Sequence, residues 1–295
     1  MFALTGNAPE ASSLFMHAAT LLGGRDPREM VVSDTFAALH ENRVGQILCT
    51  LQALAATAAL REVWPARCVI AGYSVGEVAA WGVAGLIDRT GTLDLVARRA
   101  EAMDAHSVPG DGLLFVRGLS RDTLDGLCER HDAAIAIVNP GDAFIVGGGG
   151  AALDALAVEA KDLGASRVVR VGVKVASHTS RLAAASVEFR KVLHEASIER
   201  SLEPGVRLLS GIDGSSVVDV SAGADKLAEQ ISQKISWAEC LQGCAEAGAS
   251  AFLELGPGKA LSEMAASAYP GVPSRSLEDF RSLQGVRDWL TSVER

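Results

Sequence analysis

Residues 67–77 read RCVIAGYSVGE, a short apolar run that leads into a serine flanked by glycines. The run at 67–72 is short, apolar and rich in β-branched residues, which favours a buried strand. A helical pattern over residues 77–84 follows directly. A strand, a tight turn and a helix in this order form one half of a βαβ unit. The stretch therefore predicts an α/β core with a parallel sheet and with Ser74 at the turn between a strand and a helix.

Gly72, Ser74 and Gly76 fit the pattern G-x-S-x-G, in which the serine is a nucleophile held in a strained turn. The helix behind such a turn directs its free N–H groups and the positive end of its dipole toward the serine oxygen, which favours negative charge there. The pattern is short enough to occur by chance. The strand and the helix around it carry the prediction that Ser74 is catalytic.

A second unit begins near residue 110 and has the order β-α-β-β-α-β. Its strands are predicted at residues 113–116, 133–138, 143–147 and 166–171, with helices from Ser120 and over 151–163. This order is typical of a ferredoxin-like fold. We therefore predict an α/β-hydrolase-like core made of residues 1–109 and 179–295, with a ferredoxin-like α+β subdomain inserted at 110–178. Residues 206–210 and 251–255 are predicted to add two strands to the core sheet.

Composition excludes several classes of protein. Nearly half of the 295 residues are apolar (48%), which suffices for a full core, and the net charge of −9 argues against binding to nucleic acid or to an anionic membrane. The longest uncharged run, 44–60, contains polar residues and predicts a buried helix, not a membrane span. The five cysteines form no C-x-x-C pair, and no signal peptide is visible, so we expect reduced thiols and a cytoplasmic protein.

A serine nucleophile needs a base, and His178 is the best-placed histidine. It follows the segment 171–177, where the inserted unit rejoins the core, so it can face Ser74 across a cleft. An ordinary loop histidine is the alternative that this residue alone leaves open. The other histidines lie in polar or helical stretches, where exposed or packed roles are expected: His17, His40, His106, His131 and His194.

Taken together, these motifs resemble the malonyl-CoA:acyl-carrier-protein transacylase family, which includes the acyltransferase domains of polyketide and fatty-acid synthases. Residues 71–77 (AGYSVGE) are similar to the family's G-H-S-x-G-E motif, with Tyr73 in place of the usual histidine. Residues 95–103 (LVARRAEAM), 175–178 (VASH) and 253–259 (LELGPGK) are similar to three further family motifs in the same order. The resemblance covers almost the whole chain.

The resemblance implies roles for individual residues. Ser74 is the nucleophile and His178 the base, and the backbone carbonyl of Gln230 orients the histidine. Arg99 stands at the position of the family's substrate-binding arginine, where a planar guanidinium grips the malonyl carboxylate through two parallel hydrogen bonds. An exposed helix arginine is the alternative reading of Arg99.

Two backbone N–H groups are expected to form the oxyanion hole. One belongs to Val75, and the other to Asn7, which falls on the glutamine of the family's G-Q-G motif although Ala8 replaces the second glycine. Asn139 is expected to line the acyl pocket. A plain turn residue before Pro140 is an equally open reading of Asn139.

The resemblance also implies the partners, malonyl-CoA and an acyl carrier protein, and it implies no metal or organic cofactor. Around Gly72-Tyr73-Ser74 the chain looks most like the transacylase (epsilon) subunit of malonate decarboxylase. The carrier arm is then phosphoribosyl-dephospho-CoA in place of phosphopantetheine. Three alternatives stay open: a stand-alone malonyl transferase of fatty-acid or polyketide synthesis, a serine thioesterase or other hydrolase, and a non-catalytic carrier-binding homologue.

Overall fold

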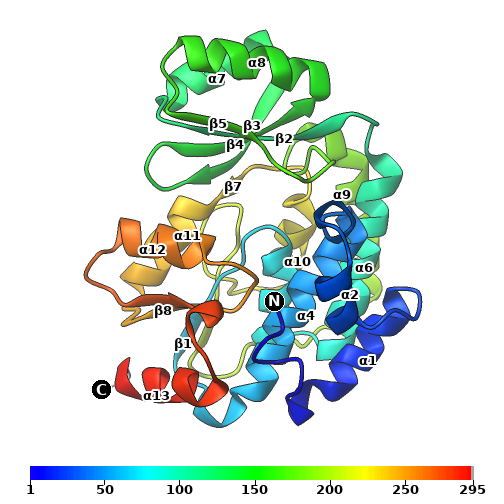
Figure 1. Cartoon of the computed structure of the whole chain (residues 1–295), viewed down its shortest axis with the longest axis vertical. Coiled ribbons are helices and arrows are strands. Elements are labelled where there is room, and N and C mark those ends of the chain that lie inside the picture. Colours follow the sequence, from blue (N-terminus) through cyan, green and yellow to red (C-terminus); the bar gives the residue numbers. More distant parts are fainter. Residues whose placement is uncertain (294–295) are drawn as a thin grey trace.

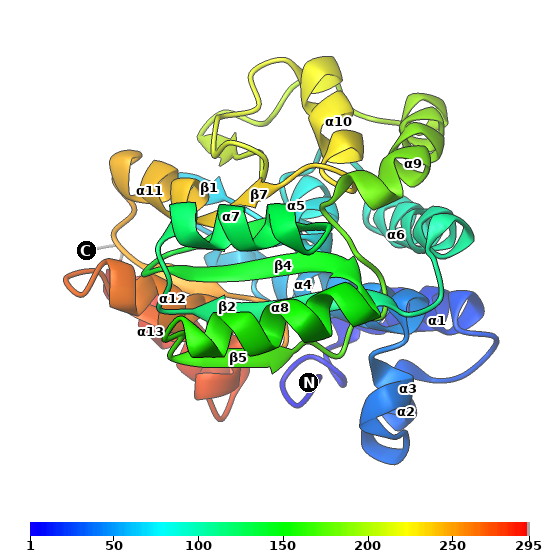
Figure 2. The same cartoon turned by 90° about the horizontal axis from the view of Figure 1, so that it is seen from above.

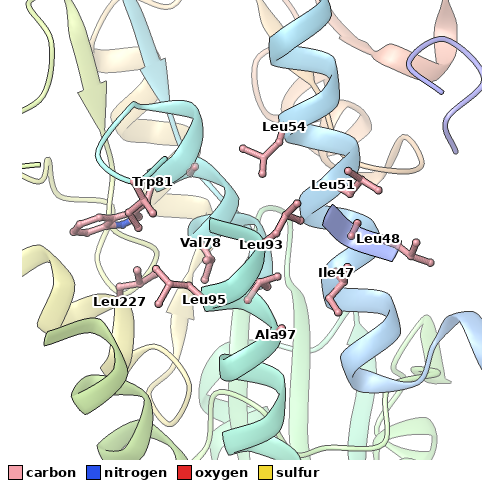
Figure 3. Packing of buried hydrophobic residues seen from close by; sticks show 14 of the residues in the cluster. Ile47, Leu48, Leu51, Leu54, Val78, Trp81, Leu93, Leu95, Ala97 and Leu227 are labelled. Carbon is pink, nitrogen blue, oxygen red and sulfur yellow. The ribbon is translucent and has the colours of Figure 1, made fainter. Parts of the chain in front are cut away.

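The computed structural model describes residues 1–293, and its large lower part is built around the long helix α4 (Asn42–Ala59). Ile47, Leu51 and Leu54 are fully buried on α4, and Figure 3 shows Ile47 and Leu54 pointing toward α5 (Val75–Val83) and α6 (Arg89–His106). The uncharged run around these residues is thus a core helix, as predicted. Within residues 1–293, no helix combines the length and the apolar character that crossing a membrane requires.

Two parallel strand pairs lie beside these helices. β1 (Cys68–Ile70) pairs with β6 (Val206–Leu208), and β8 (Phe252–Glu254) pairs with β9 (Ser274–Ser276). The predicted α/β class with parallel strands is confirmed. The prediction of one continuous core sheet is wrong, because the two pairs share no ladder. Residues of both β1 and β8 line one large cavity.

The upper part of the molecule in Figure 1 is a five-stranded sheet with the order β5-β2-β4-β3-β7. Its four antiparallel strands and two helices follow the predicted β-α-β-β-α-β order: β2 (Asp111–Arg117), α7 (Arg121–Arg130), β3 (Ala133–Asn139), β4 (Ala143–Gly149), α8 (Gly150–Asp162) and β5 (Arg167–Arg170). The fifth strand, β7 (Ile235–Ser236), was not predicted and pairs parallel with β3. β7 belongs to the predicted core segment, 179–295, yet it pairs with a strand of the predicted insertion. The division into a core and an insertion at 110–178 stays a prediction.

Alternation along the strands gives this sheet two apolar faces. Leu114, Val116 and Val146 pack on the outer face with residues of α7 and α8, which Figure 2 shows lying across the sheet. Leu113 and Ile137 point to the opposite face and line the large cavity. The sheet therefore forms the roof of that cavity.

The remaining helices surround the core. They are α1 (Ser12–Leu21), α2 (Pro27–Ser33), α3 (Phe36–Leu39), α9 (Ala183–Glu195), α10 (Val220–Glu229), α11 (Trp237–Glu246), α12 (Ala260–Ala268) and α13 (Leu283–Val293), with short 3-10 turns at Pro9–Ala11, Arg61–Val63, Ser180–Leu182 and Leu277–Asp279. Arg99, within α6, and Gln230, at the C-terminal end of α10, are hydrogen-bonded to each other, and Gln230 also contacts the turn after β1.

Candidate active site

The turn after β1 holds Ser74 in a strained backbone conformation, with φ 54° and ψ −118°. Few residues other than glycine adopt positive φ, and strain of this kind is concentrated at functional sites. Gly72 makes the turn possible, because a Cβ there would lie 2.1 Å from the backbone nitrogen of Glu77. At Gly76 an added Cβ would contact nothing within 4 Å among the described residues. Only the first glycine of the motif is therefore required by close packing.

Ser74 and His178 meet at this turn. The Oγ of Ser74 lies 2.8 Å from Nε2 of His178, and Nδ1 of His178 lies 2.5 Å from the backbone carbonyl oxygen of Gln230. A carbonyl oxygen only accepts hydrogen bonds, so Nδ1 carries the proton and Nε2 is left to accept from the serine hydroxyl. His178 is buried and also has positive φ, at 63°. The pair has the geometry of a nucleophile and its general base.

The imidazole of His178 is held in its neutral form. Burial is the main cause that lowers the pKa of His178 to about 3, and the positive charge of Arg99 lowers it further, against the hydrogen bond to Gln230. A neutral imidazole is the form that can take a proton from Ser74.

This depressed pKa predicts how the protein responds to acid. The unfolded chain binds a proton at His178 near pH 6.5 and the folded chain does not, so this group's contribution to stability is complete above about pH 6.5 and declines as the pH falls toward 3. We expect the NMR signals of the His178 ring, identified by their loss in His178→Ala, to show no titration between about pH 8 and 5. A midpoint near the ordinary value would contradict the buried neutral ring.

Arg99 lies on α6 with 1% of its surface exposed and lines the same cavity as Ser74 and His178. Its Nη1 donates to Oε1 of Gln46 at 2.6 Å, and its Nη2 donates to Oε1 of Gln230 at 2.9 Å. Burial lowers the pKa of Arg99 to about 10, so the guanidinium stays charged at neutral pH. Both partners are neutral amides, so no carboxylate in direct contact neutralises the charge.

This burial distinguishes Arg99 from its neighbour. Arg98 is exposed and lies 3.7 Å from a carboxylate oxygen of Glu101, as expected of a surface helix arginine. Arg99 is instead a cation held at the wall of the cavity. Sequence analysis assigned no role to Gln46. A glutamine in an uncharged, largely apolar helix is a usable signal, because a buried amide needs a hydrogen-bond partner.

Of the two predicted oxyanion donors, the structure brings one to the site. Val75, the first residue of α5, lines the cavity beside Ser74, and its N–H has no backbone acceptor among residues 1–293. Asn7 is exposed and does not line the cavity. Tight turns, with Gly6 N–H donating to the Phe2 carbonyl and Ala8 N–H to the Thr5 carbonyl, keep Asn7 at the surface. The expectation for Asn7 is therefore not met.

Asn139, expected in the acyl pocket, lies behind the turn instead. It is buried at the end of β3, does not line the cavity, and its side chain lies near that of Tyr73. The ring of Tyr73 packs edge-on against Trp237, with ring centroids 5.4 Å apart. Burial raises the pKa of Tyr73 to about 12, so the phenol stays neutral. Tyr73 and Asn139 thus connect the serine turn to the sheet above it.

The cavity itself has a volume of about 1770 Å³ and reaches from Ser74 along β1 and β8 to α13. Ser74, Arg99 and His178 gather on its wall, and the apolar residues of the five-stranded sheet cover it. A space of this size exceeds that of a typical small-molecule pocket. It therefore has room for an acyl thioester with part of its pantetheine arm.

Comparisons with known proteins agree in pointing to one family. No protein-family model matches the chain. A malonyl CoA-acyl carrier protein transacylase of Mycobacterium tuberculosis is 30% identical over 233 residues, which cover 76% of this chain and 76% of that protein. The crystal structure of an acyl-carrier-protein S-malonyltransferase from Burkholderia pseudomallei has a TM-score of 0.87 and 25% identity, covering 96% of this chain and 93% of the other. A malonyl-transacylase solved in complex with its type II polyketide synthase acyl-carrier protein shares the fold, with a TM-score of 0.88 at 22% identity, covering 98% of this chain and 94% of the other.

Proposed function

The chain belongs to the malonyl-CoA:acyl-carrier-protein transacylase family, and on this premise we propose that it moves a malonyl group from coenzyme A to the thiol of an acyl carrier protein. The observation that carries the proposal is the meeting of three groups on one cavity wall. These are the Ser74 hydroxyl, the neutral imidazole of His178 at 2.8 Å and the buried guanidinium of Arg99. The first two suit acyl transfer and the third suits an acyl group with a free carboxylate.

In the first half-reaction, His178 Nε2 takes the proton of Ser74 as the hydroxyl oxygen attacks the thioester carbonyl. The oxyanion forms beside the N–H of Val75 at the start of α5, where the helix dipole also favours negative charge. Losing one such donor typically costs about 3 kcal/mol of barrier. The carbon–sulfur bond then breaks, coenzyme A leaves with the proton from His178, and a malonyl ester remains on Ser74.

In the second half-reaction the carrier thiol gives its proton to His178 and attacks the ester. Collapse of the intermediate returns the proton to the Ser74 oxygen and leaves a malonyl thioester on the carrier. The backbone carbonyl of Gln230 supports both steps, because it accepts the Nδ1 proton and so stabilises the imidazolium that forms each time. This carbonyl takes the place of the aspartate in a hydrolase triad.

The charge of Arg99 supports malonyl as the acyl group. A guanidinium has five N–H groups, and Gln46 and Gln230 accept from two of them, so three remain (5 − 2) without a protein acceptor among the described residues. A carboxylate that enters the cavity can accept from this cation through two parallel bonds. A neutral acyl group offers no such partner.

Mass spectrometry of the whole protein tests this function. After incubation with malonyl-CoA we expect a malonyl adduct on Ser74, absent from Ser74→Ala, which a holo carrier protein then removes as it becomes malonylated itself. Release of free malonate with no labelled carrier would show a hydrolase. The lack of any adduct would show a non-catalytic homologue.

A finer proposal concerns the carrier. The likeness around Gly72-Tyr73-Ser74 supports the transacylase subunit of malonate decarboxylase, whose carrier has a phosphoribosyl-dephospho-CoA arm. To test this, the protein malonylated on Ser74 is mixed with each of two carrier proteins, one with this arm and one with phosphopantetheine. The rates of malonyl transfer to the two carriers are then compared. Faster transfer to the first supports the decarboxylase assignment. Faster transfer to the second favours fatty-acid or polyketide synthesis.

A further inference from the structure

Glu77 is a fully buried carboxylate behind the nucleophile, and none of the steps above uses it. It lies in the first turn of α5, where its Oε2 accepts from Nε2 of Gln230 at 2.8 Å and from the N–H of Gly211 at 3.0 Å. A Cβ at position 211 would come within 2.6 Å of the same oxygen, so only glycine lets that loop approach. The carboxylate is therefore held from two sides.

Glu77 is one of two acceptors that orient the Gln230 amide. Nε2 of Gln230 donates to the Glu77 carboxylate and, at 2.9 Å, to the backbone carbonyl of Ser74. Both of those oxygens are acceptors, so the amide NH2 must face them and the amide oxygen must face the other way. That direction leads to Nη2 of Arg99, which can only donate. If the amide were flipped, Nε2 of Gln230 would face Nη2 of Arg99, and both of these nitrogens are hydrogen-bond donors.

We propose that Glu77 is a positioning residue for acyl transfer: it fixes the Gln230 amide, which in turn aims the Arg99 guanidinium at the carboxylate of the acyl group. The inference rests on the proposed malonyl transfer and adds a residue that sets its selectivity. It also gives Gln230 two separate roles, since its backbone holds His178 while its side chain holds Arg99.

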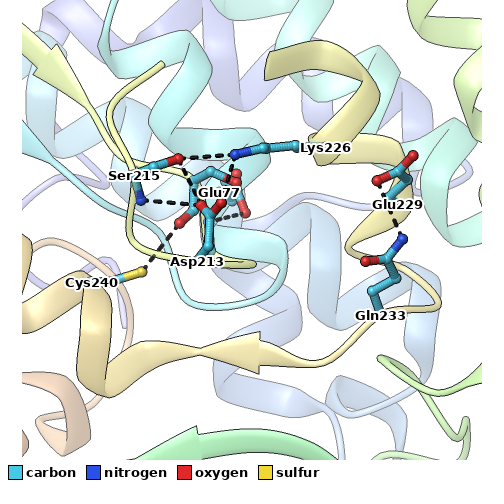
Figure 4. Close-up of polar contacts among 9 residues, drawn as sticks. Glu77, Asp213, Ser215, Lys226, Glu229, Gln233 and Cys240 are labelled. Atoms are coloured by element: carbon cyan, nitrogen blue, oxygen red, sulfur yellow. Dashed lines mark hydrogen bonds and ion pairs between the residues drawn. The ribbon is translucent and has the colours of Figure 1, made fainter. Parts of the chain in front are cut away.

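The surroundings of Glu77 suit a residue that acts by geometry. The charged or titratable groups that face it are Arg99 from α6, Asp213 from the loop after β6 and the thiol of Cys240 from α11. The carboxylate of Asp213 accepts hydrogen bonds from Lys226 and Ser215, as Figure 4 shows. Burial, as the main cause, raises the pKa of Glu77 to about 7. A neutral amide of the same shape is therefore a fair substitute for this side chain.

The experiment compares malonyl-CoA with acetyl-CoA as donors and reports the ratio of the two kcat/KM values. In Glu77→Met, which has no acceptor for the Gln230 amide, we expect this ratio to fall by about tenfold or more. In Glu77→Gln, whose amide oxygen can still accept from both Gln230 and Gly211, we expect the ratio to stay within about threefold of the native value. If Glu77→Gln keeps the malonyl-to-acetyl ratio and Glu77→Met lowers it, the hydrogen bonds of residue 77 set the ratio and its charge does not.

Two further variants keep the result interpretable. Asp111→Leu removes another buried carboxylate, one that accepts from Arg181 and does not line the cavity, and it should lower thermal stability without changing the ratio. Gln230→Met keeps the backbone carbonyl that holds His178 but removes the side-chain amide, so it should lower the ratio as Glu77→Met does. It tests the same link if Glu77→Met fails to fold. An unchanged ratio in Gln230→Met, or equal loss of malonyl and acetyl transfer in Glu77→Met, overturns the proposal. Failure of the native protein to transfer malonyl would instead overturn the proposed function.

Discussion

His178→Ala is expected to slow formation of the acyl-enzyme on Ser74 by about 10³-fold or more, which is the upper part of the range for a general base. The reason is geometric, since Nε2 of His178 lies 2.8 Å from the Ser74 oxygen and is held there by the Gln230 carbonyl. Without the imidazole, the hydroxyl has no acceptor for its proton as it attacks. Rapid-quench mass spectrometry with malonyl-CoA measures the rate.

The matched control is His194→Ala, on the exposed side of α9, where the ring lies 3.4 Å from Asp225. This change should leave the acylation rate unaltered. A native rate in His178→Ala would remove the Ser–His pair from the mechanism.

Arg99→Ala is expected to lower kcat/KM for malonyl-CoA by about 100-fold or more, and to spare acetyl transfer. Malonyl carries a free carboxylate that would lose its proposed partner, the one buried guanidinium lining the cavity among residues 1–293, whereas acetyl carries none. Steady-state kinetics with the two donors measures the difference. Arg99→Lys keeps the charge but loses the planar fork, so it should recover only part of the malonyl activity.

Arg98→Ala is the matched control, because Arg98 is exposed on the same helix and close to Glu101. It should change neither rate. Equal loss of malonyl and acetyl transfer in Arg99→Ala would mean that Arg99 supports the fold of the site and does not bind the acyl carboxylate.

The sequence predicted local elements well and non-local pairing less well. The strand before Ser74 and the order of the inserted unit follow from periodicity and turn residues, which act within a few positions along the chain. The separation of β1 from β8 does not, because strands 184 positions apart (252 − 68) pair or separate according to what packs between them. β7 has only two residues and is too short for any periodic signal.

The site shows the same contrast. Motifs marked Ser74, Arg99 and His178, which the structure places on one cavity, and Gln230, which contacts Arg99 from behind; their catalytic and binding roles stay predictions. Asn7 was assigned by its position in a motif and Asn139 by its place near a loop of the inserted unit. Where each residue lies depends on loop and strand packing that these local signals do not encode. The side-chain roles of Gln46 and Glu77 depend on contacts with residues 53 and 153 positions away. Contacts over such distances become visible only in the folded chain.

Ser74 and His178 both have positive φ, which a glycine adopts with less strain. Each of these two conformations lowers the stability of the folded chain by about 1–3 kcal/mol. A protein that used this fold only to hold a carrier would have a higher free energy of unfolding with glycine at either position, because glycine removes the strain. Both positions instead carry the side chains that form the Ser74–His178 hydrogen bond, which the proposed acyl transfer uses. The geometry of the main chain thus weighs against a protein that has become a passive binder.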